Sequence, residues 1–152
     1  MTVQRPGLKG TKAALTLAAV ACVLWLRPSA AQQANVTELE GTWEAVRSTV
    51  GETARTFKPG EMRLVFVGKT LTATGLVSYG AEAKVVEFRL DATKQPKEFD
   101  YTRAPGEVNR SIYELRGNTL TIVVPRSPSD PRPAKMDVAS RDVIVLVLER
   151  RQ

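Results

Sequence analysis

From Trp43 onward the chain is a series of short apolar runs, separated by glycine, proline, asparagine or pairs of charged residues. The runs are rich in β-branched residues, and regular short runs with turn signals between them are typical of an all-β domain. We predict strands at 43–50, 62–67, 70–74, 82–90, 99–102, 108–115, 119–124 and 143–148, with 134–138 as a possible further short strand. The pattern therefore indicates one domain of about eight strands.

The segment 82–90 has the clearest alternation. Val86, Phe88 and Leu90 fall on one face of a strand, and Glu87 and Arg89 fall on the other. We assign the first face to the core and the second to solvent.

Turn residues predict how these strands are connected. Gly68-Lys69 and Gly117-Asn118 each separate two apolar runs, which is a signal for a tight hairpin. The segment 125–133 holds four prolines in nine residues, so we expect a loop there. The run 143–148 is apolar on both faces, so both faces of this last strand should be covered.

The first 31 residues resemble a secretory signal peptide. Residues 1–12 are polar and basic, 13–26 are apolar, and 29–31 are small residues suited to cleavage after Ala31. The apolar run of 14 residues is shorter than the roughly 20 residues of a membrane span. We therefore expect an exported protein, periplasmic, on the cell surface or secreted, whose mature domain is 32–152.

Cys22, the only cysteine, leaves an alternative open. The segment 19–22 resembles a degraded lipoprotein box, although four apolar residues follow the cysteine. Membrane association is expected only if Cys22 is lipidated. Otherwise the mature chain has no cysteine, and so no disulfide.

The net charge of +6 belongs largely to this leader. Removing its four basic residues leaves 18 basic and 16 acidic residues, a net charge of +2. That charge is too small to indicate binding to a phosphate backbone, so no nucleic-acid partner is predicted.

The residue inventory argues against an enzyme. The chain has no histidine and the mature part no cysteine, which removes the usual nucleophilic triads and zinc or haem ligands, so we predict no cofactor and no metal site. The densest polar cluster lies at 91–101, where Lys94 and Lys97 oppose cation binding. We interpret it as a structured loop capped by Asp91 and Thr93. A carboxylate hydrolase or lyase would need two buried, adjacent acidic groups facing one cleft.

Four ordered motifs resemble a known family. They are 39–43 (LEGTW), 90–100 (LDATKQPKEFD), 112–120 (IYELRGNTL) and 132–133 (RP). Together they resemble the uncharacterised exported domain that is abundant in planctomycete-type bacteria, whose fold is described as lipocalin-like. This copy departs from the family pattern at Arg116, Asn118 and Met136.

The resemblance implies a single antiparallel, up-and-down, lipocalin-like β-barrel of about eight strands, and it implies no known activity. By similarity to lipocalins, Trp43 closes the barrel base and a basic residue of the last strand covers it. Arg150, with Arg151 as the alternative, should then stack on Trp43 in a cation–π contact of order 1 kcal/mol. A closed barrel would also remove exposed sheet edges.

Two functions remain open at this level. The first is a non-catalytic binding module for a small apolar or amphipathic ligand, with Phe66, Tyr79, Phe88 and Tyr113 as candidate pocket-lining residues. The second is a structural domain of the cell envelope with a filled barrel and a protein partner. An apolar cavity of several hundred Å³ would favour the first.

Overall fold

The structure, a computed structural model, describes residues 38–75, 83–137 and 139–152. The expected leader, Cys22 and Tyr79 lie outside the described residues. The described part is almost entirely β-structure, with one helical turn before the first strand. None of its helices is long and apolar enough to cross a membrane.

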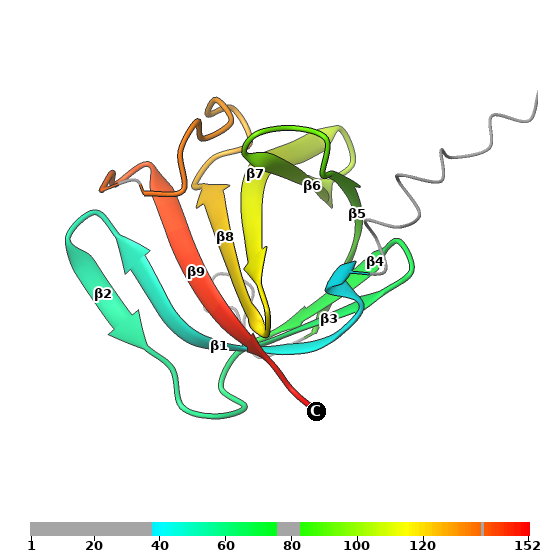
Figure 1. The fold of residues 1–152 in the computed structure, drawn as a ribbon. Coiled ribbons are helices and arrows are strands. Elements are labelled where there is room, and N and C mark those ends of the chain that lie inside the picture. Colours follow the sequence, from blue (N-terminus) through cyan, green and yellow to red (C-terminus); the bar gives the residue numbers. More distant parts are fainter. Residues whose placement is uncertain (1–37, 76–82, 138) are drawn as a thin grey trace, which may run out of the picture.

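The described strands are all antiparallel, and eight of them close into a barrel (Figure 1). Their bounds are β1 Gly41–Val50, β2 Thr53–Thr56, β3 Arg63–Val67, β4 Thr70–Thr74, β5 Lys84–Asp91, β6 Lys97–Ala104, β7 Glu107–Arg116, β8 Thr119–Pro125 and β9 Val143–Arg150. From β3 to β9 each strand pairs with the next, and β9 returns to pair with β1. The predicted all-β, single-barrel class is confirmed.

The long first strand has three neighbours. Its first half pairs with β3, its second half pairs with β2, and β9 runs along its other side. A bulge between Ala45 and Arg47 interrupts the pairing with β9. Bulges bend and twist a strand, which suits the closure of a barrel. Because β2 pairs with β1 alone, it lies beside the barrel rather than in its wall.

Two strand predictions need correction. The short strand β2 was missed because its sequence, TART, is exposed throughout and has no apolar alternation. The possible strand at 134–138 is absent at 134–137, and Val138 lies outside the described residues. Met136 in that segment instead packs on the outer wall of the barrel. The side chains of this segment cover the wall, but its backbone at 134–137 forms no strand.

The proline-rich segment covers part of the barrel wall, as the orange loop at the top of Figure 1. Met136 and Val145 pack against a small cluster of buried residues on the outside of β7, β8 and β9: Ile112, Val123 and Val143. Arg132 joins the same loop to β6, with its guanidinium donating to both carboxylate oxygens of Asp100, at 2.6 and 3.0 Å. Thus the start of the last strand is covered on its outer face, as its doubly apolar sequence predicts.

The barrel interior is packed with aromatic side chains at one level. The rings of Phe66, Phe88 and Phe99 meet with centroids 5.2 to 6.1 Å apart. Offset and edge-to-face pairs of this kind stabilise beyond the area that they bury. Val86 and Leu90 point inward with Phe88, and Glu87 and Arg89 are exposed, as the alternation predicts.

Candidate functional site

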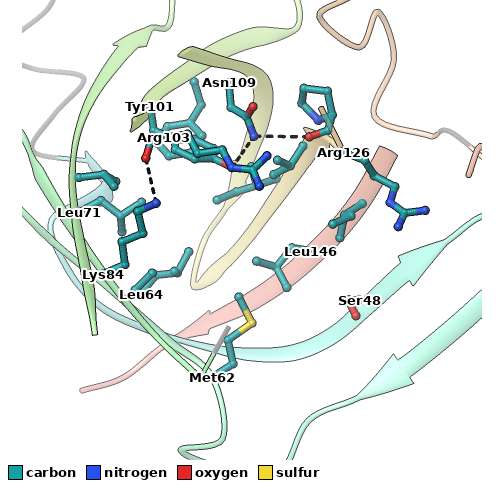
Figure 2. A pocket seen from close by; sticks show the side chains of 18 of the residues that line it. Ser48, Met62, Leu64, Leu71, Lys84, Tyr101, Arg103, Asn109, Arg126 and Leu146 are labelled. Carbon is teal, nitrogen blue, oxygen red and sulfur yellow. Dashed lines mark hydrogen bonds between the residues drawn. The ribbon is translucent and has the colours of Figure 1, made fainter. Parts of the chain in front are cut away.

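The barrel encloses a cavity of about 240 Å³ at the end opposite Trp43. Its body is apolar and is formed by inward-facing residues of most of the barrel strands, among them Leu64, Leu71, Val86, Ile122 and Leu146. Figure 2 shows Leu64, Leu71 and Leu146 converging on one space from facing walls. The other half of the barrel is filled, so the molecule has one hollow end and one packed end.

Small residues on β4 and just after it help to make this space. Ala73 faces the cavity between larger neighbours, and Gly75 lies at its edge. Gly75 has a positive φ of 76°, and a Cβ at this position would lie 1.9 Å from the carbonyl oxygen of Glu61. Glycine is therefore required for the close approach of these two backbone segments.

Four of the described residues that line the cavity are basic. Lys84 begins β5, Arg103 lies near the end of β6, Arg126 follows β8, and Arg55 lies on β2. Lys84 Nζ donates to the carbonyl oxygen of Arg103 at 2.8 Å, which joins the first two. Figure 2 shows Lys84 and Arg103 on one side of the cavity and Arg126 on the other. None of the described residues that line the cavity is acidic.

A buried amide links three strands beside the mouth of the cavity. Asn109 Nδ2 donates to the hydroxyl of Tyr101 at 2.6 Å and to the carbonyl oxygen of Pro125 at 3.5 Å (Figure 2). Its Oδ1 is buried without a hydrogen-bond partner. Turning the amide over would place that oxygen against the Pro125 carbonyl, which only accepts, so the orientation is well defined. Asn109 thereby holds the ring of Tyr101 at the cavity wall.

The opposite end of the barrel is sealed by the segment that precedes β1. Trp43 Nε1 donates to the carbonyl oxygen of Leu39 at 2.8 Å. Arg150 donates to the carbonyl oxygens of Glu40 and Glu38, at 2.5 and 2.6 Å, and its guanidinium carbon lies 4.3 Å from the centroid of the Trp43 ring. The structure therefore brings together the two residues expected at the barrel base.

A second group of polar contacts strengthens this seal. The carboxylate of Glu38 accepts hydrogen bonds from Tyr113 Oη at 2.7 Å and from Lys97 Nζ at 3.0 Å. Burial, together with the hydrogen bond to Glu38, raises the pKa of Tyr113 well above its ordinary value. Because these groups satisfy one another, they leave no open polar site among the described residues of the base.

Three of the four aromatic residues expected to line a pocket lie among the described residues, and they are found outside the cavity lining. Phe66, Phe88 and Tyr113 are almost fully buried, but they fill the packed half and do not line the cavity. Tyr79 lies outside the described residues. Strand alternation shows which residues point inward and does not show at which height along the barrel they lie, so it could not separate these three residues from those that line the cavity.

The polar residues at the mouth were missed, although the alternation contains a signal for them. Lys84 has the same parity as Val86 and Phe88, and Arg103 has the same parity as Phe99. Extending the inward face by one pair of residues would have placed both side chains inside the barrel mouth. Arg126 lies beyond the end of its strand, where the alternation makes no prediction.

The polar residues at 91–101 stabilise the turn after β5 and the attachment of the proline-rich segment. Asp91 Oδ1 accepts hydrogen bonds from the backbone N–H of Thr93 at 3.0 Å and from its hydroxyl, which lowers the pKa of Asp91. This is the capped turn that the sequence predicts. Glu98 and Asp100 are paired with Arg132. Within 38–75, 83–137 and 139–152, no three histidine, cysteine, aspartate or glutamate side chains are grouped to hold a metal ion.

A comparison of the chain with models of protein families finds no match, and neither do comparisons with curated proteins and with solved structures. The resemblance to the planctomycete-type exported domain therefore stays a prediction. Inferences about function accordingly rest on the geometry of the cavity.

Proposed function

We propose that the protein is a non-catalytic exported binding module, which takes a small apolar or amphipathic ligand into the hollow end of its barrel. The observation that carries this proposal is the division of the interior into a packed half and a hollow half. Pockets for small molecules are concave and mostly apolar, with a few polar groups at defined positions. The cavity has this composition, with an apolar body and a polar mouth.

The volume limits the ligand. A cavity of 240 Å³ lies just below the roughly 300–1,000 Å³ that is usual for ligand pockets. A medium-length alkyl chain or one substituted ring fits within it. A long-chain lipid would have to extend well beyond the mouth.

The alternative is an envelope domain that binds a protein partner through its outer surface. Val67 on β3 and Val85 on β5 favour it, since both valines are 63% exposed. Singly exposed apolar residues are common on soluble proteins, however. The cavity is the more specific feature, so ligand binding is the leading proposal.

Protein-observed NMR with octan-1-ol as a neutral alkyl probe tests the proposal. Protein produced from the full-length chain is titrated with the probe, and its processed mass is recorded. We expect shifts of the Ala73 methyl and of the Asn109 side-chain amide that saturate with probe concentration. Native mass spectrometry of the same preparation should show a non-covalent adduct that is lost on denaturation.

Two matched variants locate the binding. Ala73→Ile adds bulk inside the cavity, and Thr72→Ile changes the neighbouring residue, whose side chain is on the outer face of the same strand. Ala73→Ile should abolish the saturating shifts, and Thr72→Ile should leave them unchanged. The absence of saturable binding to the unaltered protein would overturn the proposal and favour the protein-partner domain.

A further inference from the structure

We infer that the ligand carries an aromatic ring, which the cavity holds between Phe57 on one wall and the rings of Phe99 and Tyr101 on the opposite wall. This inference rests on the proposed function and adds the chemical class of the ligand. An apolar cavity by itself would suit any small apolar molecule. The placement of the aromatic side chains therefore carries the argument.

The first step is the aromatic surface on β6. Phe99 and Tyr101 have the same parity on this strand, and both line the cavity. Their ring centroids lie 5.8 Å apart, with an angle of 34° between the ring planes. The hydroxyl of Tyr101 accepts the hydrogen bond from Asn109, which fixes the end of that side chain. The two rings therefore form one continuous wall, at a distance where aromatic rings attract one another.

The second step is the aromatic ring on the opposite side. Phe57 follows β2 and also lines the cavity. Its backbone N–H donates to the carbonyl oxygen of Val46 at 3.1 Å, which holds it beside β1. Around the barrel, β6 is separated from β1 by β3, β4 and β5 in one direction and by β9, β8 and β7 in the other. Phe57 and the β6 rings thus approach the cavity from opposite walls.

The third step is that these rings are held in place by their neighbours. Phe99 packs on Phe66 and Phe88 of the filled half, with centroids 6.1 and 5.9 Å away. The guanidinium carbon of Arg55 lies 4.7 Å from the centroid of the Phe57 ring. Contacts that are positioned in advance favour a rigid ligand, because a ring loses no internal rotations on binding, whereas an alkyl chain does.

The remaining lining and the volume suit a single ring. Met62 lines the cavity, and Figure 2 shows it on the side opposite Tyr101. A thioether makes favourable contacts with aromatic rings, often at the ring edge. An apolar cavity of about 150 Å³ is large enough for benzene. A cavity of 240 Å³ therefore admits one ring with a small substituent.

Three neutral alcohols with seven carbon atoms each test this inference by NMR titration: benzyl alcohol, cyclohexylmethanol and heptan-1-ol. They differ only in the shape and aromaticity of the apolar part, so the charge of the protein does not decide among them. Benzyl alcohol has the least apolar surface, and the hydrophobic effect alone would place it last. We expect it to bind about threefold more tightly than cyclohexylmethanol, because ring–ring contacts outweigh that difference. It should also bind more tightly than heptan-1-ol.

Variants assign the preference to the two walls. Phe57→Leu and Phe99→Leu each remove one ring from the lining and keep an apolar side chain there. Each should lower the preference for benzyl alcohol over cyclohexylmethanol about twofold. Phe88→Leu is the matched control, since it removes a ring that packs on Phe99 but does not line the cavity. It should leave the preference unchanged.

Phe57→Leu keeps the test valid if Phe99→Leu does not fold, because Phe57 is only partly buried. In the unaltered protein, nuclear Overhauser effects should connect the ring protons of benzyl alcohol with those of Phe57 and Phe99.

The outcomes separate this inference from the proposed function. Equal affinities for the three alcohols, tighter binding of an aliphatic one, or a preference that survives both lining variants would overturn the aromatic ligand and leave the binding module intact. Failure of every alcohol to bind would overturn both.

Discussion

The guanidinium of Arg150 covers the ring of Trp43 and at the same time binds the two carbonyl groups that precede the first strand. The last strand, the first strand and the entering segment therefore meet in one contact. This arrangement makes Arg150 the residue that seals the base of the barrel. A lysine should not reproduce these contacts, since only the planar, forked guanidinium reaches a ring and two carbonyls together.

Arg150→Ala should lower the free energy of unfolding by about 2–4 kcal/mol, because a cation–π contact and two charge-assisted hydrogen bonds are lost. Arg150→Lys should recover only a small part of that loss. Urea unfolding followed by Trp43 fluorescence measures both values. Arg116→Ala is the matched control, since Arg116 makes only an exposed ion pair with Glu114, and it should cost less than about 1 kcal/mol. Equal losses at the two positions would contradict the sealing role.

Gly75→Ala should be strongly destabilising, by more than about 3 kcal/mol, because the added Cβ meets the backbone of Glu61 in addition to the backbone strain. Gly68→Ala is the control. Gly68 also has a positive φ, of 55°, but no atom lies within 4 Å of the position of its Cβ. Its cost should be that of the strain alone, about 1–2 kcal/mol. Thermal and urea unfolding of the two variants check the difference, and similar losses would show that the contact with Glu61 is not tight.

Arg132→Ala should detach the proline-rich segment from the barrel wall. Arg132 donates to both carboxylate oxygens of Asp100 and to the carbonyl oxygen of Ser111, so its loss should cost about 2–3 kcal/mol. We expect faster amide hydrogen exchange in 126–137 and new proteolytic cleavage there. Arg126→Ala, on the same segment but without an ion pair among the described residues, should leave exchange unchanged. Unaltered exchange in Arg132→Ala would show that the packing of Met136 suffices.

Ser111→Ala should raise the free energy of unfolding by about 1 kcal/mol. The Ser111 hydroxyl is fully buried inside the barrel and has no hydrogen-bond partner, so a methyl group removes an unsatisfied polar atom. Ser140→Ala is the control, because the Ser140 hydroxyl donates to Asp142 and accepts from its backbone N–H. That variant should be neutral or less stable. Destabilisation by Ser111→Ala would indicate that the hydroxyl is satisfied by a bound water.

Glu44 should make stability depend on pH in the acidic range. The hydrogen bond from Arg151, helped by Gly60 N–H and Arg63, lowers the pKa of the Glu44 carboxyl below its ordinary value of 4.5. A carboxyl group whose pKa is lowered by folding stabilises the protein above its unfolded-state pKa, and the contribution is lost as pH falls through the lower, folded-state value.

Glu44→Gln should therefore be less stable than the unaltered protein at pH 7, and the difference should shrink as pH falls through 4.5 and vanish below the lower, folded-state pKa. Melting temperatures measured from pH 7 to pH 2.5 test this expectation. Glu114→Gln, which removes only the exposed ion pair with Arg116, should track the unaltered protein throughout. A constant difference between Glu44→Gln and the unaltered protein would mean that shape, and not charge, matters at Glu44.

The sequence by itself determined the fold class, the hairpins and the inward faces of the strands. Two kinds of local signal determine them, period-two alternation, as at Val86, Phe88 and Leu90, and glycine turns such as Gly68-Lys69. Both depend only on the conformations that neighbouring residues can adopt. The position of Trp43 beside a basic residue of the last strand followed from family resemblance, since no local signal joins residues more than a hundred positions apart.

Only the tertiary structure decided where the barrel is hollow. Phe66 and Lys84 both face inward by alternation, but the first lies in the packed half and the second at the mouth, and that difference depends on strand stagger around the closed barrel. Closure also placed Lys84, Arg103 and Arg126 around one opening. Since register and closure are properties of all eight strands together, the set of residues that meet at the mouth could not be read from any single strand.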